Sequence, residues 1–167
     1  APTVIGDTVF SCLQDHQVRA TRLSTGEVFW TTRLRSVPRA WRPRNSIVAR
    51  GVHISGEVDV VGVRTSDGTE VWRYADSGTY LIPDLYLGTD GEHVAFGARG
   101  GDVVLLDAAT GAVRWRRTLM RDTASAFGAP VFVDGAVVYI RQRLAFEPPD
   151  GEPIAFALEV ATGETRW

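Results

Sequence analysis

The fold is decided by the stretch LLDAATGAVRW at residues 105–115, because its pattern occurs three more times in the chain. The other copies are ATRLSTGEVFW at 20–30, GVRTSDGTEVW at 62–72 and ALEVATGETRW at 157–167. All four align without gaps, with glycine in the seventh position and tryptophan in the last. The tryptophans at 30, 72, 115 and 167 follow one another at intervals of 42, 43 and 52 residues. The 167-residue chain therefore consists of repeats, and the fourth carries an insertion.

Each copy of the motif reads as a β-hairpin. A β-prone run leads through a polar turn to glycine, and a second short β-prone run closes on tryptophan. A Thr-Gly or Asp-Gly pair suits a type I turn followed by a left-handed residue, which glycine adopts without the penalty that a β-carbon brings. We therefore expect a conformational role for the four motif glycines, Gly26, Gly68, Gly111 and Gly163.

More strand material lies upstream of each hairpin. Thr8 to Leu13 should pair with Val18 to Leu23, and His93 to Ala98 with Val103 to Asp107. No segment has a convincing helical period. Four short antiparallel strands per unit of 40 to 50 residues are typical of a β-propeller, so the prediction is an all-β propeller of four-stranded blades. Its four visible blades should lie at about 1–34, 35–76, 77–120 and 121–167.

The four segments resemble the tryptophan-docking motif of the pyrroloquinoline-quinone-like (quinoprotein-like) β-propeller repeat. That consensus runs small residue, x, Asp, x, x, Thr, Gly, Glu or Lys, x, x, Trp. The sequence departs from it at Leu105 in the first position, at Arg22 and Arg64 in the third, and at Asp67 in the sixth. The resemblance implies that each tryptophan lies across the junction with a neighbouring blade, over its motif glycine. It assigns a structural docking role to Trp30, Trp72, Trp115 and Trp167.

Four blades in an open arc would expose unpaired strand edges at both ends. We therefore expect a segment of a ring of seven or eight blades. Two alternatives stay open: a homodimer that completes one ring, and a closed four-blade ring. The start at Ala1 fits a processed chain or an excised fragment.

Composition excludes several kinds of function. All 18 basic residues are arginine, so a phosphate loop that needs lysine and lysine-based catalysis are impossible. A net charge of −2 gives no global basic field, and we expect no nucleic-acid partner. No apolar run is long enough to span a bilayer.

Catalytic patterns are also missing, and we expect no catalytic residue, metal site or cofactor. Enzymes of the resembled family hold their quinone between a tryptophan and a disulfide of adjacent cysteines, with a calcium ion bound by Glu and Asn. This chain has one cysteine, Cys12, and one asparagine, Asn45. The three histidines lack the spacing of zinc ligands, and no GxSxG motif occurs.

Two stretches are candidates for partner binding. Residues 33–50, RLRSVPRAWRPRNSIVAR, concentrate arginines around Trp41, which lies outside the motif. A solvated connection between blades explains this stretch, and a surface for an anionic partner is the alternative. The insertion in the fourth unit contains Phe146 and a Pro-Pro pair. The candidate binding residues are Arg39, Trp41, Arg42, Arg44 and Phe146.

The leading hypothesis for function is a non-catalytic binding or scaffolding module that engages protein partners, or the remaining blades of its own propeller. Similar repeats occur in extracytoplasmic bacterial proteins, so we expect a periplasmic or extracellular location. Two alternatives are a fragment of a quinone-dependent dehydrogenase with its cofactor site in other blades, and a module that binds sugars or polyanions through the arginine-rich stretch.

Overall fold

The computed structural model describes residues 2–13, 16–34, 46–56, 59–75, 86–98, 101–120, 126–142 and 155–167. These residues form four antiparallel sheets of four strands each and contain no α-helix, which confirms the predicted all-β class. Accordingly, none of them belongs to a helix that could cross a membrane.

The first two sheets are simple meanders in which each strand pairs with the next one along the chain. The first sheet contains β1 (Thr3–Ile5), β2 (Thr8–Leu13), β3 (Gln17–Arg22) and β4 (Val28–Arg33). The second contains β5 (Ser46–Ala49), β6 (Val52–Gly56), β7 (Val60–Arg64) and β8 (Glu70–Tyr74). In both, the motif forms the hairpin between the third and fourth strands, as predicted.

The third sheet repeats this meander, and the fourth departs from it. The third contains β9 (Leu87–Thr89), β10 (His93–Gly97), β11 (Asp102–Asp107) and β12 (Val113–Thr118). The fourth contains β13 (Ala126–Phe127), β14 (Val131–Val133), β15 (Ala136–Gln142) and β16 (Ala155–Glu159).

In the fourth sheet, β13 and β14 both pair with β15, so one strand position is divided in two. Pro130, which has no N–H to donate, lies in the break between them. The motif strand is reduced to a single bridge between Leu158 and Thr165. The predicted four-stranded blade therefore has four strands here, but in a different arrangement.

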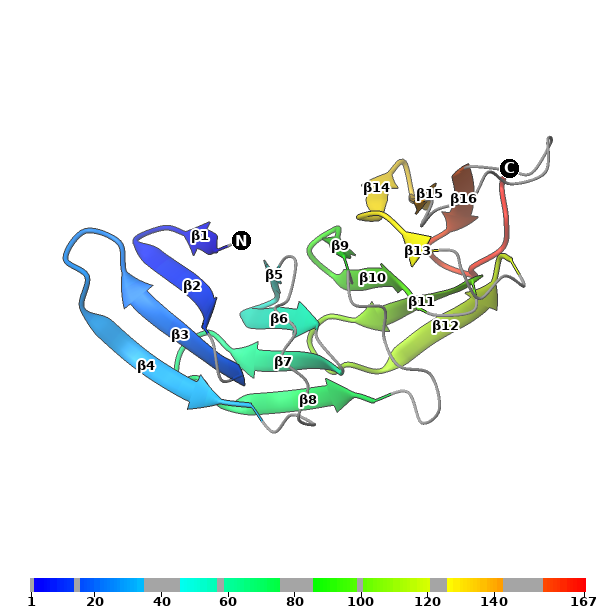
Figure 1. Ribbon diagram of the computed structural model, residues 1–167. Helices are drawn as coiled ribbons and strands as arrows, with labels where there is room; N and C mark the ends of the chain where they lie inside the picture. The colour runs from blue at the N-terminus through cyan, green and yellow to red at the C-terminus, as the bar shows by residue number, and fades with distance from the viewer. Residues whose placement is uncertain are drawn as a thin grey trace.

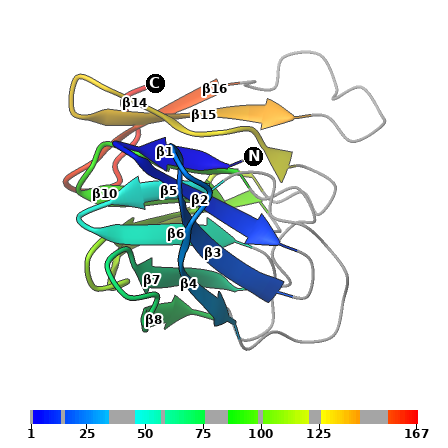
Figure 2. The same cartoon turned by 90° about the vertical axis from the view of Figure 1, so that its left-hand side faces the viewer.

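The four sheets fan out side by side, as Figure 1 shows. The strands along one side of the array are neighbours in space: β1 contacts β5, β5 contacts β9, and β9 contacts β14, the second half of the divided strand described above. The last strands β4, β8 and β12 follow the opposite, convex side of the array (Figure 1). In the view from the N-terminal end, the first sheet lies in front of the second, and strands of the fourth sheet appear above it (Figure 2).

Burial along the third strand of each sheet depends on how many of its faces are covered. In β11, Val103 to Leu106 are all buried, because sheets pack on both sides. In β3, Val18 and Ala20 are buried, whereas the alternating residues Gln17, Arg19 and Thr21 are only partly covered. The alternation in β3 shows that the first sheet packs against a neighbour with one face only.

The core consists of apolar layers between adjacent sheets. The layer between the second and third sheets is centred on Trp72 and includes Ile54, Phe96 and Leu106. The layer between the third and fourth sheets is centred on Trp115 and includes Tyr139 and Phe156. Each layer therefore contains a motif tryptophan.

Candidate functional site: the tryptophan contacts between sheets

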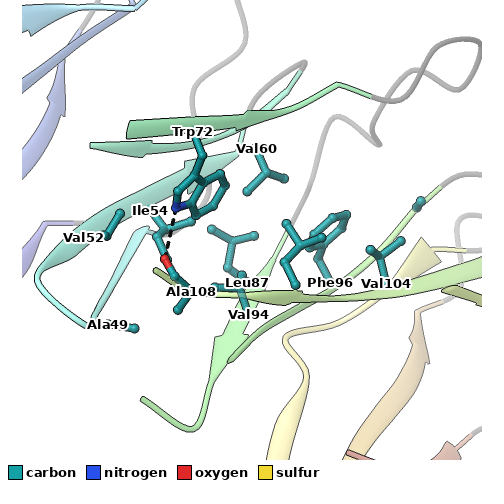
Figure 3. Close-up of a cluster of buried hydrophobic side chains, with 12 residues drawn as sticks. Ala49, Val52, Ile54, Val60, Trp72, Leu87, Val94, Phe96, Val104 and Ala108 are labelled. Carbon is teal, nitrogen blue, oxygen red and sulfur yellow. Dashed lines mark hydrogen bonds between the residues drawn. The ribbon is translucent and has the colours of Figure 1, made fainter. Parts of the chain in front are cut away.

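Trp72 shows how a motif tryptophan joins two sheets. Its indole Nε1 donates a hydrogen bond of 3.0 Å to the carbonyl oxygen of Ala108 in the next sheet (Figure 3). A Cβ built on Gly111 would lie 2.6 Å from the indole, so the ring rests against a backbone that has no side chain there. Within its own sheet the ring covers Gly62, where a Cβ would overlap it. The indole is therefore held between two glycines, and only 8% of the residue remains exposed.

The same contact occurs at the junctions on either side. Trp30 Nε1 donates to the carbonyl of Thr65 at 3.0 Å, and Trp115 Nε1 donates to the carbonyl of Val160 at 2.8 Å. Built Cβ atoms on Gly68 and Gly163 would lie 2.6 and 2.7 Å from these two rings. In each case the acceptor residue stands three positions before the contacted glycine. The contact is therefore one structural unit used at three junctions.

A polar side chain two residues after the tryptophan extends the contact at two of these junctions. Thr32 Oγ1 donates to the carbonyl of Gly68 at 2.5 Å, and Arg117 Nε donates to that of Gly163 at 3.1 Å. Sequence reasoning missed these residues because the motif was read as ending at tryptophan. A polar side chain in the second position after tryptophan was the available signal.

Trp167 is the exception among the four motif tryptophans. The resemblance predicted that each would lie across a junction, but Trp167 is 65% exposed. Its backbone occupies the usual place, because the Ala157 N–H donates to the Trp167 carbonyl and the Arg166 N–H donates to the Ala157 carbonyl. The difference arises because no described sheet follows the fourth one. Among the described residues, the Trp167 indole covers no glycine turn.

The motif glycines have the backbone conformation that the turn analysis predicted. Their φ angles are +77°, +76°, +70° and +71° for Gly26, Gly68, Gly111 and Gly163. Gly26 nevertheless stands apart, because a Cβ built there would meet nothing within 4 Å. The first sheet therefore has a glycine turn like those that a tryptophan covers in the other sheets, but no indole of the described residues lies on it.

Two charge arrangements occupy the motif turns, and they account for the departures from the consensus at Arg22, Arg64 and Asp67. Where the third motif position is acidic, the residue before tryptophan is arginine, and the two pair: Arg114 with Asp107 at 2.8 Å, and Arg166 with Glu159. Where the third position is arginine, its acidic partner lies within the hairpin. Arg64 pairs with Asp67 at 2.9 Å, and Arg22 pairs with Glu27 at 3.2 Å.

The Asp107 carboxylate also organises the turn backbone. Its Oδ1 accepts hydrogen bonds from the N–H groups of Ala109 and Thr110 at 3.1 and 3.0 Å, and from the Thr110 hydroxyl. Partial burial raises the pKa of this carboxyl group, but the hydrogen bonds from Arg114 and Thr110 outweigh that effect and bring it to about 2. The acidic third position of the motif therefore stabilises the conformation of its own turn.

His53 is a fully buried histidine at the junction of the first two sheets. Its ring stacks on Phe10 with centroids 5.5 Å apart. Neither ring nitrogen has a hydrogen-bond partner among the described residues. Because burial disfavours the charged imidazolium, the pKa of His53 falls from 6.5 to about 4. The ring is therefore neutral at physiological pH and packs as an aromatic side chain.

The described residues do not assemble a catalytic centre of the types considered. They contain no group of three or more His, Cys, Asp or Glu side chains placed to hold a metal ion. His93 pairs with Asp90, whose Oδ2 lies 2.9 Å from its Nδ1, within a turn. Cys12 lies on β2 opposite Val18 and is the one cysteine of these 167 residues, so they do not contain the adjacent cysteine pair of that quinone site. The residues present do not fit the quinone site of the resembled dehydrogenases.

The residues predicted to bind partners lie outside the part of the chain that the structure describes. They are Arg39, Trp41, Arg42, Arg44 and Phe146. Of the site residues predicted from the sequence, the described part of the chain brings together the motif tryptophans and glycines.

Comparison with known proteins agrees with this geometry. The family model described as "Outer membrane protein assembly factor BamB", of the PQQ-like repeat type, matches residues 56–167. The chain belongs to this family. The matched range covers the last three copies of the motif, and the family membership confirms the predicted PQQ-like β-propeller. No curated protein matches the sequence.

Solved structures support the same fold. BamB from Moraxella catarrhalis is 22% identical with a TM-score of 0.67, over 97% of this chain and 46% of that one. The computationally designed Ika8 protein is 18% identical with a TM-score of 0.72, over 99% and 47%. A europium-containing methanol dehydrogenase is 15% identical with a TM-score of 0.73, over 99% and 40%. The chain therefore spans less than half the length of each of these propellers.

Proposed function

We propose that this propeller region is a non-catalytic module that binds or scaffolds protein partners through the loops joining its strands and sheets. One observation carries the proposal: the residues that define the repeat stabilise the fold. Three of the four motif tryptophans hold neighbouring sheets together, and the motif carboxylates order their own turns. The family match supports this role, because the family's description names an outer membrane protein assembly factor.

Rigid sheets with variable loops suit this role, because a fixed scaffold can present binding residues on its connections. The arginine-rich stretch around Trp41 and the insertion containing Phe146 are the proposed contact regions. Arginine forks bind carboxylates in a bidentate manner, and an aromatic ring adds contact area. We therefore propose that the partner presents acidic side chains beside an apolar one.

Site-specific photo-crosslinking in the native cells tests this proposal. A photoreactive amino acid replaces Arg42 or Phe146 in the full-length protein, and Ser66, exposed in a motif turn, is the matched control position. We expect a discrete protein adduct from position 42 or 146 and none from position 66. Absence of adducts at both contact positions, or equal labelling at all three, contradicts the proposed surfaces.

The quinone-dependent dehydrogenase is the competing function, and a cofactor titration separates it from the binding module. The full-length protein is mixed with pyrroloquinoline quinone and Ca²⁺, and cofactor absorbance and dye reduction with alcohols are recorded. We expect neither signal. Stoichiometric quinone uptake with substrate-dependent dye reduction would replace the binding role by an enzymatic one.

We also propose an extracytoplasmic location, which the family description supports through its reference to the outer membrane. Protease treatment of intact cells and of cells with a permeabilised outer envelope tests it. Degradation without lysis of the inner membrane is the expected result, and protection until that membrane is lysed contradicts it.

A further inference from the structure

The last strand of the first sheet, β4, has one edge that pairs with no other strand of the described chain, because β4 is bonded to β3 alone. The Leu34 N–H donates to the His16 carbonyl and so fixes the phase of the β3–β4 ladder. Hydrogen-bonded pairs alternate along antiparallel strands, so Thr31 and Arg33 direct their N–H and C=O groups away from β3. We call these outward backbone groups the β4 edge. An unpaired row of this kind can bond to an added strand.

The exposure of β4 follows from its place on the convex side of the array, and not from its membership of the first sheet (Figure 1). Val28 and Phe29 at the start of β4 are 48% and 44% exposed. The residues that correspond to them in the aligned motifs include Val113 and Val71, which are 51% and 36% exposed. These two belong to the third and second sheets, which have a neighbour on either side. A neighbour packed before the first sheet would therefore leave β4 accessible.

The corresponding edges of β8 and β12 carry a charged side chain at the residue that follows the motif tryptophan. Arg73 Nη1 donates to Asp59 at 2.7 Å, and Arg116 Nε donates to Asp102 at 2.7 Å. A strand added beside either arginine would remove water from its guanidinium, which costs free energy. Charged side chains of this kind protect natural sheet edges against pairing.

The first sheet lacks this protection. Thr31 stands where the other two sheets have arginine, and Gln17 stands where they have aspartate. Threonine is neutral and is favoured in strands, so it does not oppose a new neighbour. Of the three convex strands β4, β8 and β12, β4 is therefore the one best suited to accept another strand.

The side chains along β4 indicate the chemistry of the occupant. Val28 and Phe29 are apolar, and Arg33 at the other end is exposed and makes no ion pair with a described residue. A second cation lies beside the strand, since Arg19 Nε donates to Thr31 Oγ1 at 3.1 Å. Edge-to-edge pairing of two copies of this chain would bring their arginines together. An acidic segment would neutralise them, so charge favours a different protein as the occupant.

We propose that an extended segment of a partner protein adds to the β4 edge as one more antiparallel strand. An acidic residue of the segment lies opposite Arg33, a β-branched residue lies opposite Thr31, and an apolar residue lies beside Val28 and Phe29. The main-chain groups of the segment bond to those of Thr31 and Arg33. The proposal rests on the proposed binding role, but it uses a surface different from the loops.

Fluorescence anisotropy with the full-length protein and a labelled peptide, Ser-Glu-Thr-Val-Thr-Ile-Ser, tests the proposal. We expect saturable binding of this peptide. N-methylation of its valine removes a hydrogen bond to β4 and should weaken binding about tenfold. N-methylation of the threonine before that valine is the matched control, because this N–H points away from β4, and it should have little effect. Lysine in place of glutamate should also weaken binding, by about threefold to tenfold.

Two variants of the protein test the same contacts. Thr31→Pro removes an N–H that the fold does not use, so the chain should stay folded and lose the peptide. Thr118→Pro on β12 is the matched control, because the Leu119 N–H donates to the Gly101 carbonyl and Thr118 therefore points its own N–H outward. It should bind the peptide like the original chain. Arg33→Glu keeps the backbone intact and should reverse the preference, so that the lysine peptide binds more tightly than the glutamate peptide.

Three results would overturn the proposal: no saturable binding of the glutamate peptide, equal binding of the N-methylvaline peptide, or an unchanged preference in Arg33→Glu. Self-association that Thr31→Pro abolishes would assign the edge to a second copy instead. The loop crosslinks give an independent result. Adducts from position 42 or 146 without peptide binding would preserve the proposed function and remove the β4 edge from it. Peptide binding without those adducts would do the opposite for the loops.

Discussion

The indole Nε1 of Trp72 lies 3.0 Å from the carbonyl oxygen of Ala108, a residue 36 positions further along the chain. The contact joins the second sheet to the third at a place where no β-ladder connects them. It combines a hydrogen bond with the burial of the largest natural side chain. Contacts of this kind are suited to holding together sheets that otherwise touch only through side chains.

Removal of this indole should destabilise the chain strongly. Trp72→Ala takes away a residue that is 92% buried and leaves the Ala108 carbonyl without its donor. We expect the free energy of unfolding to fall by about 3–5 kcal/mol. Urea denaturation followed by far-UV circular dichroism measures the change. Trp167→Ala is the control, and it should change stability by less than about 1 kcal/mol, because its ring is mostly in solvent.

Alanine at two motif glycines should have unequal effects. Gly26 and Gly111 both have a positive φ, so each substitution introduces backbone strain of about 1–2 kcal/mol. At Gly111 the new methyl group would also lie 2.6 Å from the Trp72 ring, which must then move. Gly111→Ala should therefore be the more destabilising of the two, as measured by thermal unfolding. Equal losses would mean that the indole does not depend on the absence of a side chain.

His53 should make stability depend on pH in the mildly acidic range. Its pKa is about 4 in the folded chain and 6.5 when exposed, so the unfolded chain takes up the proton first as the pH falls. Stability is complete above pH 6.5 and decreases between pH 6.5 and pH 4. Between pH 7.5 and pH 5 the loss from this residue is about 2 kcal/mol, by linkage. Denaturation curves at both pH values measure it.

The matched variant for this test is His53→Phe, which keeps an aromatic ring against Phe10 and cannot be protonated. Its stability should change by about 2 kcal/mol less than that of the original chain over the same interval. The same pH dependence in both proteins would assign the effect to other groups.

Asp107 should contribute stability that disappears in acid. Its folded pKa is about 2 against 3.8 when exposed, so its contribution is present above pH 4 and is lost as the pH falls toward 2. At neutral pH, Asp107→Ala should cost about 1 kcal/mol, because two turn N–H groups and the Thr110 hydroxyl lose their acceptor. The difference from the original chain should shrink at low pH. The control is Glu164→Ala, at an exposed position in the fourth motif, which should be nearly neutral at both pH values.

Local sequence signals predicted much of the fold because they act within one hairpin. The β-prone runs located β2 and β10 to within a residue at each end, and the recurring Thr-Gly or Asp-Gly turn located the hairpin between the third and fourth strands of the first three sheets. The divided strand β13–β14 was not predicted, since Pro130 at the start of a β-prone run looks like an ordinary strand boundary. The motif tryptophans could be assigned to junctions by resemblance, but their acceptor carbonyls could not, because each lies in another repeat.

The parts that sequence reasoning missed depend on contacts between distant residues. Nothing around His53 in the sequence indicates that it will stack on Phe10, 43 positions earlier. The third motif position is acidic in Asp107, which pairs with Arg114, and basic in Arg64, which pairs with Asp67. In the sequence this difference was visible only as a departure from the consensus. Its compensating partners became apparent once the hairpins were folded.

The acceptors of the tryptophan contact are a main-chain carbonyl and a residue without a side chain, features that every repeat possesses. The tryptophan contact consequently does not distinguish one repeat from another. By itself it determines neither the order of the sheets nor their number. Gain or loss of a whole repeat would leave the remaining joints chemically intact. The order of the sheets must then depend on side-chain pairs that occur at one junction, such as Phe10 with His53. Sheet faces that carry such pairs would be the least tolerant of a change of neighbour.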